Sequence, residues 1–258
     1  WLISHRPFAF KETALSGCEC AQHAALCGMR ILRLWTDFLW LLYPLRCAAC
    51  ERDLVEGEKA ICTHCRYRLP RTHFHHFPGN VVERHFWGKI PLVAAAACFH
   101  FSKGERVQRM IHHLKYKQRP DVGVEVGTWY GRDLLQVPAF ASIDLIIPVP
   151  LHPEKLRLRG YNQAACFAEG LGIGMGKTVL PDGLRKVVAT STQTRKHRFD
   201  RFRNVEHVFQ AADPAGLTGR HILLVDDVIT TGSTLVSCAE TLLEVPGVRI
   251  SIVGMAAA

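Results

Sequence analysis

The sequence lacks any uninterrupted apolar stretch long enough to cross a bilayer. Its longest apolar run covers residues 31–45 and contains Arg33 and Asp37, whereas a spanning helix needs roughly 20 consecutive apolar residues. Residues 1–28 also lack the basic start, apolar stretch and small-residue cleavage site of a signal peptide. We therefore expect a cytoplasmic protein without a membrane span, in which residues 29–46 form an amphipathic helix.

The sequence contains fewer acidic than basic residues. The chain has 23 Asp and Glu against 32 Lys and Arg, which gives a formal net charge of +9. This balance suits anionic ligands such as phosphates, pyrophosphate or nucleic acid, but it does not choose among them. Apolar residues make up 48% and charged residues 21% of the 258 positions. Such a composition excludes a disordered chain and allows one sizeable α/β domain with a small accessory module.

The chain divides by pattern into a leader, a cysteine module, a connector and a large domain. Residues 1–28 show no periodicity and precede Met29, so we expect a disordered leader or upstream sequence there. Residues 47–70 contain paired cysteines, and residues 71–91 form a polar, His-rich connector. From residue 92 to residue 258, apolar runs typical of strands alternate with amphipathic stretches.

This alternation favours a parallel sheet flanked by helices, with a ligand at the carboxyl ends of its strands. Gly123 and Gly127 count against one of the helices. We expect strands at residues 92–101, 145–149, 184–188, 205–209, 221–225 and 248–254, and helices at residues 105–116, 122–135, 161–171 and 233–243.

The most informative segment is a strand followed by two acids and a hydroxyl-rich loop. Asp226 and Asp227 follow the strand, and a T-T-G-S-T loop occupies residues 230–234, where a helix is expected to begin. Free backbone N–H groups and the positive end of a helix dipole can hold a phosphate there, while Gly232 permits close approach and positive φ. The acids suit sugar hydroxyl groups, and Mg²⁺ through water. A helix cap beside solvated acids explains neither the paired acids nor the paired threonines.

Two basic segments suit the binding of pyrophosphate. Arg157 and Arg159 precede Gly160 and an expected helix, although a solvated basic loop is the plainer interpretation. Residues 195–203 carry five arginines and lysines. These cations suit an exposed loop, a nucleic-acid contact or a lid that excludes water from a reaction, and we favour the lid.

Four of the ten cysteines have the paired spacing of a metal site. C-A-A-C and C-T-H-C form two knuckles from Cys47, Cys50, Cys62 and Cys65, separated by eleven residues. Four thiolates from two such knuckles can surround one structural Zn²⁺, with a hairpin between them. Redox chemistry and buried free thiols are the alternatives, and zinc is favoured over both.

The acid-and-loop segment resembles the motif of type I phosphoribosyltransferases that binds 5-phosphoribosyl 1-diphosphate (PRPP). The resemblance implies that Asp226 and Asp227 are catalytic residues holding the ribose 2- and 3-hydroxyls. It also implies that the 5-phosphate is bound by Thr230, Thr231, Gly232, Ser233 and Thr234.

A wider resemblance to the ComF family covers residues 30–256. The pyrophosphate-side segment of that family resembles I-P-V-P-L-H at residues 147–152 with Arg157, Arg159 and Gly160. Its lid resembles the segment around Gln193, Arg201 and Asn204, and its zinc finger resembles the two cysteine knuckles.

This resemblance implies a type I phosphoribosyltransferase-like fold behind a small N-terminal zinc finger. It implies PRPP as ligand with Mg²⁺, a role in DNA uptake, and single-stranded DNA or DNA-uptake proteins as partners. The alternative is an enzyme of nucleotide salvage, or another phosphoribosyltransferase with an unidentified acceptor. The sequence leaves open whether the chain transfers the phosphoribosyl group or only binds PRPP.

Overall fold

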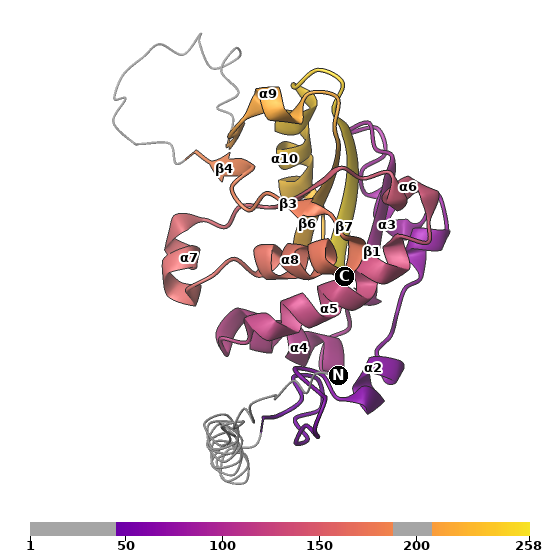
Figure 1. Cartoon of the computed structure of the whole chain (residues 1–258), viewed down its shortest axis with the longest axis vertical. Helices are drawn as coiled ribbons and strands as arrows, with labels where there is room; N and C mark the ends of the chain where they lie inside the picture. Colours follow the sequence, from indigo (N-terminus) through magenta and orange to yellow (C-terminus); the bar gives the residue numbers. More distant parts are fainter. Residues whose placement is uncertain (1–44, 188–207) are drawn as a thin grey trace, which may run out of the picture. The chain divides into compact units, whose positions relative to one another are not determined.

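The centre of the molecule is a parallel five-stranded sheet (Figure 1). The computed structural model describes residues 45–187 and 208–258. The strand order is β1-β7-β6-β2-β3, and all neighbours are parallel. The strands are β1 (Ala94–His100), β2 (Leu145–Pro148), β3 (Thr178–Val179), β6 (His221–Ile229) and β7 (Arg249–Ala257). The expected fold class is therefore confirmed.

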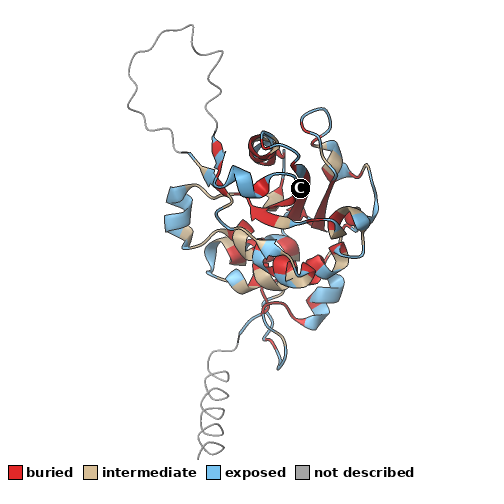
Figure 2. Cartoon of the chain, turned by 45° about the horizontal axis from the view of Figure 1, so that its top comes forward, coloured by how far each residue is buried: buried red, intermediate tan, exposed pale blue. Residues whose placement is uncertain are grey.

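Helices cover both faces of this sheet. The first layer contains α4 (Arg106–Tyr116), α5 (Pro120–Leu134) and α8 (Gln163–Met175), and the second contains α10 (Ser233–Leu243). Side chains of β6 alternate between the layers: Leu223 and Val225 belong to the first core, whereas Ile222 and Leu224 belong to the second. Figure 2 accordingly shows buried strands between helices with exposed outer turns.

Glycines allow α5 and α8 to pack in close contact. A Cβ at Gly127 would lie 2.3 Å from the Phe167 carbonyl oxygen, and one at Gly170 would lie 2.2 Å from the Val124 carbonyl oxygen. The residues that weakened the expectation of a helix are therefore required by its packing, because only a hydrogen atom fits at these positions.

Shorter elements fill the connections. The cysteine module contains α2 (Thr63–Arg68), and the connector contains η1 (Phe74–His76) and α3 (Val81–Arg84). Further along the chain are α6 (Pro138–Ala141), α7 (Pro153–Arg159) and α9 (Pro214–Leu217). The strands β4 (Leu184–Lys186) and β5 (Phe209–Ala211) form a separate antiparallel pair. These two strands are thus not part of the parallel sheet, and β5 begins where the expected strand at residues 205–209 ends.

The strand that leads into the candidate site is longer than expected. It continues past the acids, and Ile229 still pairs with Ala257 of β7. The acids therefore project from an ordered strand rather than from a loop.

The expected leader at residues 1–28 and nearly all of the expected helix at residues 29–46 lie outside the described residues. Within the part of the chain that the structure describes, no helix combines the length and the apolar character needed to cross a bilayer.

Candidate functional site

The acid pair lies at the carboxyl end of the central strand β6, as the sequence predicts. The backbone N–H of Asp227 donates a 2.8 Å hydrogen bond to Oδ1 of Asp226. Burial, followed by the neighbouring charge of Asp227, raises the pKa of Asp226 to about 7. Burial disfavours the charged carboxylate, and a second carboxylate close by adds to that effect.

The hydroxyl-rich loop connects this strand to α10. Gly232 is the N-cap with φ of 72°, and the helix begins at Ser233. Thr231 and Ser233 contact each other through their hydroxyl oxygens at 3.0 Å. A hollow of about 90 Å³ is lined by Asp226, Val228 and residues 229–235. Since the first N–H groups of a helix lack helical partners, the loop has the geometry of an anion cradle.

The connector supports this loop, which the sequence did not indicate. Phe86 is fully buried and packs against Gly232, where a Cβ would lie 2.9 Å from Phe86 Cε1. His85 Nδ1 lies 3.0 Å from the carbonyl oxygen of Thr230. Phe86 is one of three phenylalanines in the connector, so the sequence alone does not mark it as the anchor.

A lysine that the sequence did not single out contacts the acid pair. Lys115 Nζ lies 2.9 Å from Oδ2 of Asp227, and Lys115 belongs to the last turn of α4. The Lys115 and Asp227 side chains are only 22% and 15% exposed. No sequence pattern connects residues so far apart in the chain, so only the fold reveals this ion pair.

The basic residues assigned to the pyrophosphate side lie on a helix rather than in a loop. His152 caps the start of α7 and Pro153 occupies its first turn, while Gly160 ends it at φ 79°. Arg159 donates a 2.8 Å hydrogen bond to Gln163, and its guanidinium lies 5.4 Å from the ring centre of Tyr116, next to Lys115.

The structure thus places Arg159 near the end of α4, whereas Arg157 is exposed. The remaining candidates, Gln193, Arg201 and Asn204, lie outside the described residues.

The four cysteines of the two knuckles come together in space. Their sulfur atoms all lie within 4.8 Å of one another, and three of the four residues are buried. Tetrahedral sulfur ligands that lie ~2.3 Å from zinc are ~3.8 Å apart, and the Sγ atoms of Cys50 and Cys62 are 3.7 Å apart. The backbone N–H of Cys62 donates to Cys47 Sγ at 3.2 Å. The donor set and its spacing are compatible with a structural zinc ion.

The loop between the knuckles is not the expected hairpin. The carboxylate of Glu58 accepts hydrogen bonds from the backbone N–H groups of Val55 and Thr63. Gly57, at φ 90°, lies in the turn between Val55 and Glu58. The Glu58 N–H itself donates to the Val55 carbonyl oxygen at 3.0 Å. One backbone hydrogen bond and two contacts to a carboxylate therefore hold this loop, where a hairpin would have a ladder of backbone hydrogen bonds.

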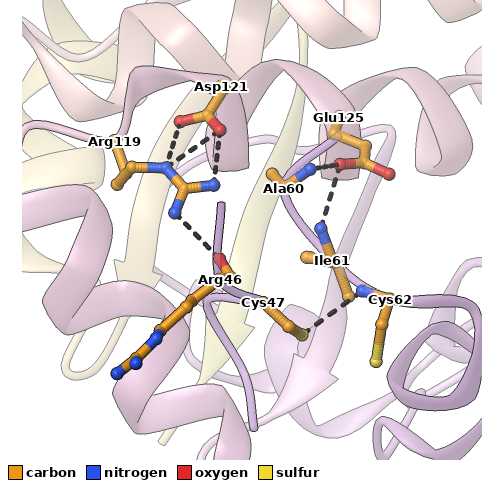
Figure 3. Close-up of polar contacts among 8 residues, drawn as sticks. All are labelled: Arg46, Cys47, Ala60, Ile61, Cys62, Arg119, Asp121 and Glu125. Carbon is orange, nitrogen blue, oxygen red and sulfur yellow. Dashed lines mark hydrogen bonds and ion pairs between the residues drawn. The ribbon is translucent and has the colours of Figure 1, made fainter. Parts of the chain in front are cut away.

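The cysteine module is fixed to α5 and to its N-cap residue Arg119 by hydrogen bonds at both knuckles (Figure 3). Oε2 of Glu125 accepts from the N–H groups of Ala60 and Ile61 at 2.6 and 3.2 Å, immediately before Cys62. Arg119 donates to the carbonyl oxygen of Arg46, immediately before Cys47. Both contacts involve backbone next to a cysteine of the cluster, so the module is part of the same folded body as the sheet.

Two solved structures are similar to part of this chain. One is the glutamine phosphoribosylpyrophosphate (PRPP) amidotransferase from B. subtilis complexed with ADP and GMP, at 22% sequence identity and a TM-score of 0.38, covering 55% of this chain and 30% of that chain. The other is described as the allosteric regulatory enzyme of purine biosynthesis, at 22% identity and a TM-score of 0.37, covering 55% and 29%. The chain thus spans less than a third of the length of either protein. No family model matches the chain.

Curated relatives cover more of the sequence. DNA utilization protein YhgH of Escherichia coli is 28% identical over 201 residues, which is 76% of this chain and 83% of the relative. Competence protein F of Haemophilus influenzae is 27% identical over 240 residues, covering 84% and 98%. Competence protein ComFC of Bacillus subtilis is 32% identical over 100 residues, covering 39% and 38%. These relatives confirm the resemblance to the ComF family.

Proposed function

We propose that this chain is a ComF-like protein of the phosphoribosyltransferase type that binds PRPP and acts in DNA uptake in the cytoplasm. The observation that carries the proposal is the strand, acid pair, hydroxyl-rich loop and helix at residues 221–243. The names of the relatives, DNA utilization protein and competence protein, support the cellular role.

The proposed binding mode follows from the chemistry of each part. The N–H groups of the loop at residues 230–234 hold the 5-phosphate, with Gly232 allowing the backbone to approach. Asp226 and Asp227 accept hydrogen bonds from the ribose 2- and 3-hydroxyls. Arg159 and Gly160 lie on the pyrophosphate side, and the lid with Gln193, Arg201 and Asn204 closes over the ligand.

In this proposal Mg²⁺ enters the site together with PRPP and is not held by the protein alone. When bound, Mg²⁺ neutralises phosphate oxygens and is held by carboxylates, directly or through water. Within the described residues, only the four-cysteine cluster has three or more candidate metal ligands close together. The acid pair alone is therefore assigned to the sugar, and the pyrophosphate would bring the cation.

In a transfer reaction, a nucleophile would form a bond to the ribose anomeric carbon while the bond to pyrophosphate breaks. Arginines would stabilise the charge of the departing pyrophosphate, and the lid would exclude water. The second candidate function, nucleotide salvage or another transfer to an unidentified acceptor, rests on this same site. A protein that binds PRPP without transfer would show no pyrophosphate release.

For the cysteine cluster we propose one structural zinc ion, held by Cys47, Cys50, Cys62 and Cys65. Residues 47–70 would form this zinc module, joined by the connector at residues 71–91 to a phosphoribosyltransferase-like domain at residues 92–258. The proposal is supported by the convergence of the four sulfur atoms.

The test combines binding with turnover. Calorimetric titration with PRPP and Mg²⁺ is expected to show one site per chain, and absence of binding would refute the proposal. Release of pyrophosphate in the presence of a panel of nucleobases and amines would establish transfer and identify the acceptor class.

A further inference from the structure

The last turn of α4, residues 113–116, joins three separate segments of the protein. Two of its contacts are already described: Lys115 with the acid pair and Tyr116 with Arg159. In addition, His113 Nε2 lies 3.6 Å from Glu51 Oε1 in the cysteine module, and the Tyr161 hydroxyl donates a hydrogen bond to the Leu114 carbonyl oxygen.

Each of the four consecutive residues in this turn therefore has its own partner. The position of Lys115 is fixed from both sides, because the residues on either side of it are held by other segments.

The contacts of the acid pair leave one oxygen of each carboxylate for a ligand. Asp226 uses Oδ1 to accept from the Asp227 N–H, and Asp227 uses Oδ2 to contact Lys115. The oxygens not used in these contacts are Oδ2 of Asp226 and Oδ1 of Asp227. Two acceptors on adjacent residues match two hydroxyl donors on adjacent carbons of a ribose.

Two adjacent, mostly buried carboxylates repel each other unless a cation is close. Among the described residues, Lys115 is the cation within 4 Å of either acid. From the opposite side, Cys238 of α10 faces Asp226, but burial raises the pKa of its thiol well above the usual range and keeps it neutral. The charge of Lys186 in β4 lowers the pKa of the Cys238 thiol, but by less than burial raises it. Lys115 is therefore the residue whose positive charge offsets the negative charge of Asp226 and Asp227.

We propose that Lys115 is a positioning residue of the sugar-phosphate site, whose ammonium group balances the acid pair and fixes Asp227 so that both carboxylates accept from the ribose hydroxyls. The identity of this ligand rests on the proposed function. The effect of Lys115 on the acids does not, since it requires no ligand.

The first measurement therefore uses the ligand-free protein. Carbon-detected NMR can follow the carboxyl group of Asp226 through a pH titration. Lys115→Met, which keeps the length of the side chain and removes its charge, is expected to move protonation of Asp226 to higher pH, because the charge of Lys115 lowers the pKa of that carboxyl. Lys115→Arg is expected to restore the wild-type titration. The matched control is Lys117→Met, because Lys117 is exposed two residues away.

The second measurement compares ribose 5-phosphate with PRPP by calorimetry. Because Lys115 acts on the acids that hold the sugar, Lys115→Met is expected to weaken both ligands by the same factor, on the order of tenfold at pH 7. The difference should shrink at higher pH, where Asp226 is ionised in both proteins. Lys117→Met should bind both ligands as the wild type does.

The outcomes are distinguishable. An unchanged titration in Lys115→Met, or an equal shift in Lys115→Arg, overturns the positioning role. A loss confined to PRPP would mean that Lys115 contacts pyrophosphate instead, and this also overturns it. If wild-type protein binds neither ligand, the proposed function fails, while the titration still decides the effect of Lys115. If Lys115→Met does not fold, Lys115→Gln, which removes the same charge, takes its place in both measurements.

Discussion

Gly232 combines two requirements that no other residue meets. Its φ of 72° lies in the left-handed region, and a Cβ there would lie 2.9 Å from the buried ring of Phe86. The left-handed conformation costs a residue with a Cβ roughly 1–2 kcal/mol. We expect Gly232→Ala to lower the free energy of unfolding by at least that amount, as measured by chemical denaturation, because the clash with Phe86 adds to it.

The same substitution is expected to abolish binding of ribose 5-phosphate and PRPP, because the loop that cradles the phosphate must move away from Phe86. Gly176→Ala is the matched control. Gly176 has φ of 64° with open space where a Cβ would lie, and it caps α8 away from the site. Gly176→Ala should be less stable than the wild type but should bind both ligands with unchanged affinity. Normal binding by Gly232→Ala would show that the phosphate does not lie on this loop.

Asp226 gives the site a pH dependence with a defined sign. Its pKa is raised to about 7, first by burial and then by Asp227. The ribose hydroxyls need the carboxylate form, so PRPP affinity is expected to rise as the pH increases through 7. Asp226→Asn removes the titrating group and should weaken PRPP by about ten- to a hundredfold at pH 8, the value of a hydrogen bond to a charged group.

The unfolding of the ligand-free protein provides the control for this prediction. A raised pKa in the folded state means that the native protein retains a proton that the unfolded chain has lost. As the pH rises from 4 to about 7, the free energy of unfolding of the wild type should therefore fall relative to that of Asp226→Asn.

The binding measurement has its own internal control. The 5-phosphate of PRPP titrates equally with both proteins, so the ratio of the two PRPP affinities isolates the effect of Asp226. A ratio that stays constant between pH 6 and 8 would contradict the assignment.

At the scale of elements, Glu125 of α5 couples the cysteine module to the sheet domain. It is half-buried, and this burial raises its pKa. It accepts hydrogen bonds from the N–H groups of Ala60 and Ile61, just before Cys62. Replacing Glu125 by alanine removes the acceptor of the hydrogen bonds from the Ala60 and Ile61 N–H groups. We expect wild-type protein to contain one zinc per chain by elemental analysis, and Glu125→Ala to lose zinc to a chelator about tenfold faster.

Glu169→Ala offers a matched control, because Glu169 is an exposed residue of α8 outside the contacts with the module. Its rate of zinc release should equal that of the wild type. Equal rates in Glu125→Ala would mean that docking on α5 does not support the metal cluster. Absence of zinc from wild-type protein purified without chelators would refute the zinc assignment itself.

Elements with a local pattern could be predicted from the sequence, whereas those that depend on distant partners could not. The helix Ser233–Leu243 was predicted with its observed bounds, because a hydroxyl-rich loop precedes a periodic apolar run. The close approach of α5 and α8 required knowing that Gly127 faces a backbone carbonyl group of another helix. Similarly, the acid pair could be found locally, but Phe86 and Lys115 reach it only through the fold.

The short elements were missed for a different reason. The α7 helix has a start signal in Pro153 and an end signal in Gly160, but its seven residues carry no apolar face that would mark it, and none of them is buried. The two-stranded pair β4–β5 was assigned to the main sheet because strand patterns do not specify their partners.

At the scale of the whole molecule, the excess of positive charge bears on the proposed role in DNA uptake. The cysteine module does not supply this excess, because its four arginines and lysines are matched by four acidic residues. It nevertheless presents exposed cations, among them Arg52, Lys59 and Arg68. Tyr67, next to Arg68, is 84% exposed. Cations that contact phosphates, together with an exposed aromatic ring that stacks on bases, form the combination with which proteins bind single strands.

We therefore expect single-stranded DNA to bind through the cysteine module and independently of the sugar-phosphate site. With three phosphate contacts, affinity should fall about twentyfold between 50 and 200 mM salt. Fluorescence anisotropy of a labelled oligonucleotide should show Tyr67→Ala and Arg68→Ala each weakening DNA while leaving PRPP affinity unchanged. The matched control is Arg132→Ala, an exposed arginine outside the module, which should bind DNA as the wild type does. Equal losses in Arg68→Ala and Arg132→Ala, with none in Tyr67→Ala, would assign the binding to net charge alone. Undiminished binding in the Tyr67 and Arg68 variants would place DNA elsewhere on the molecule.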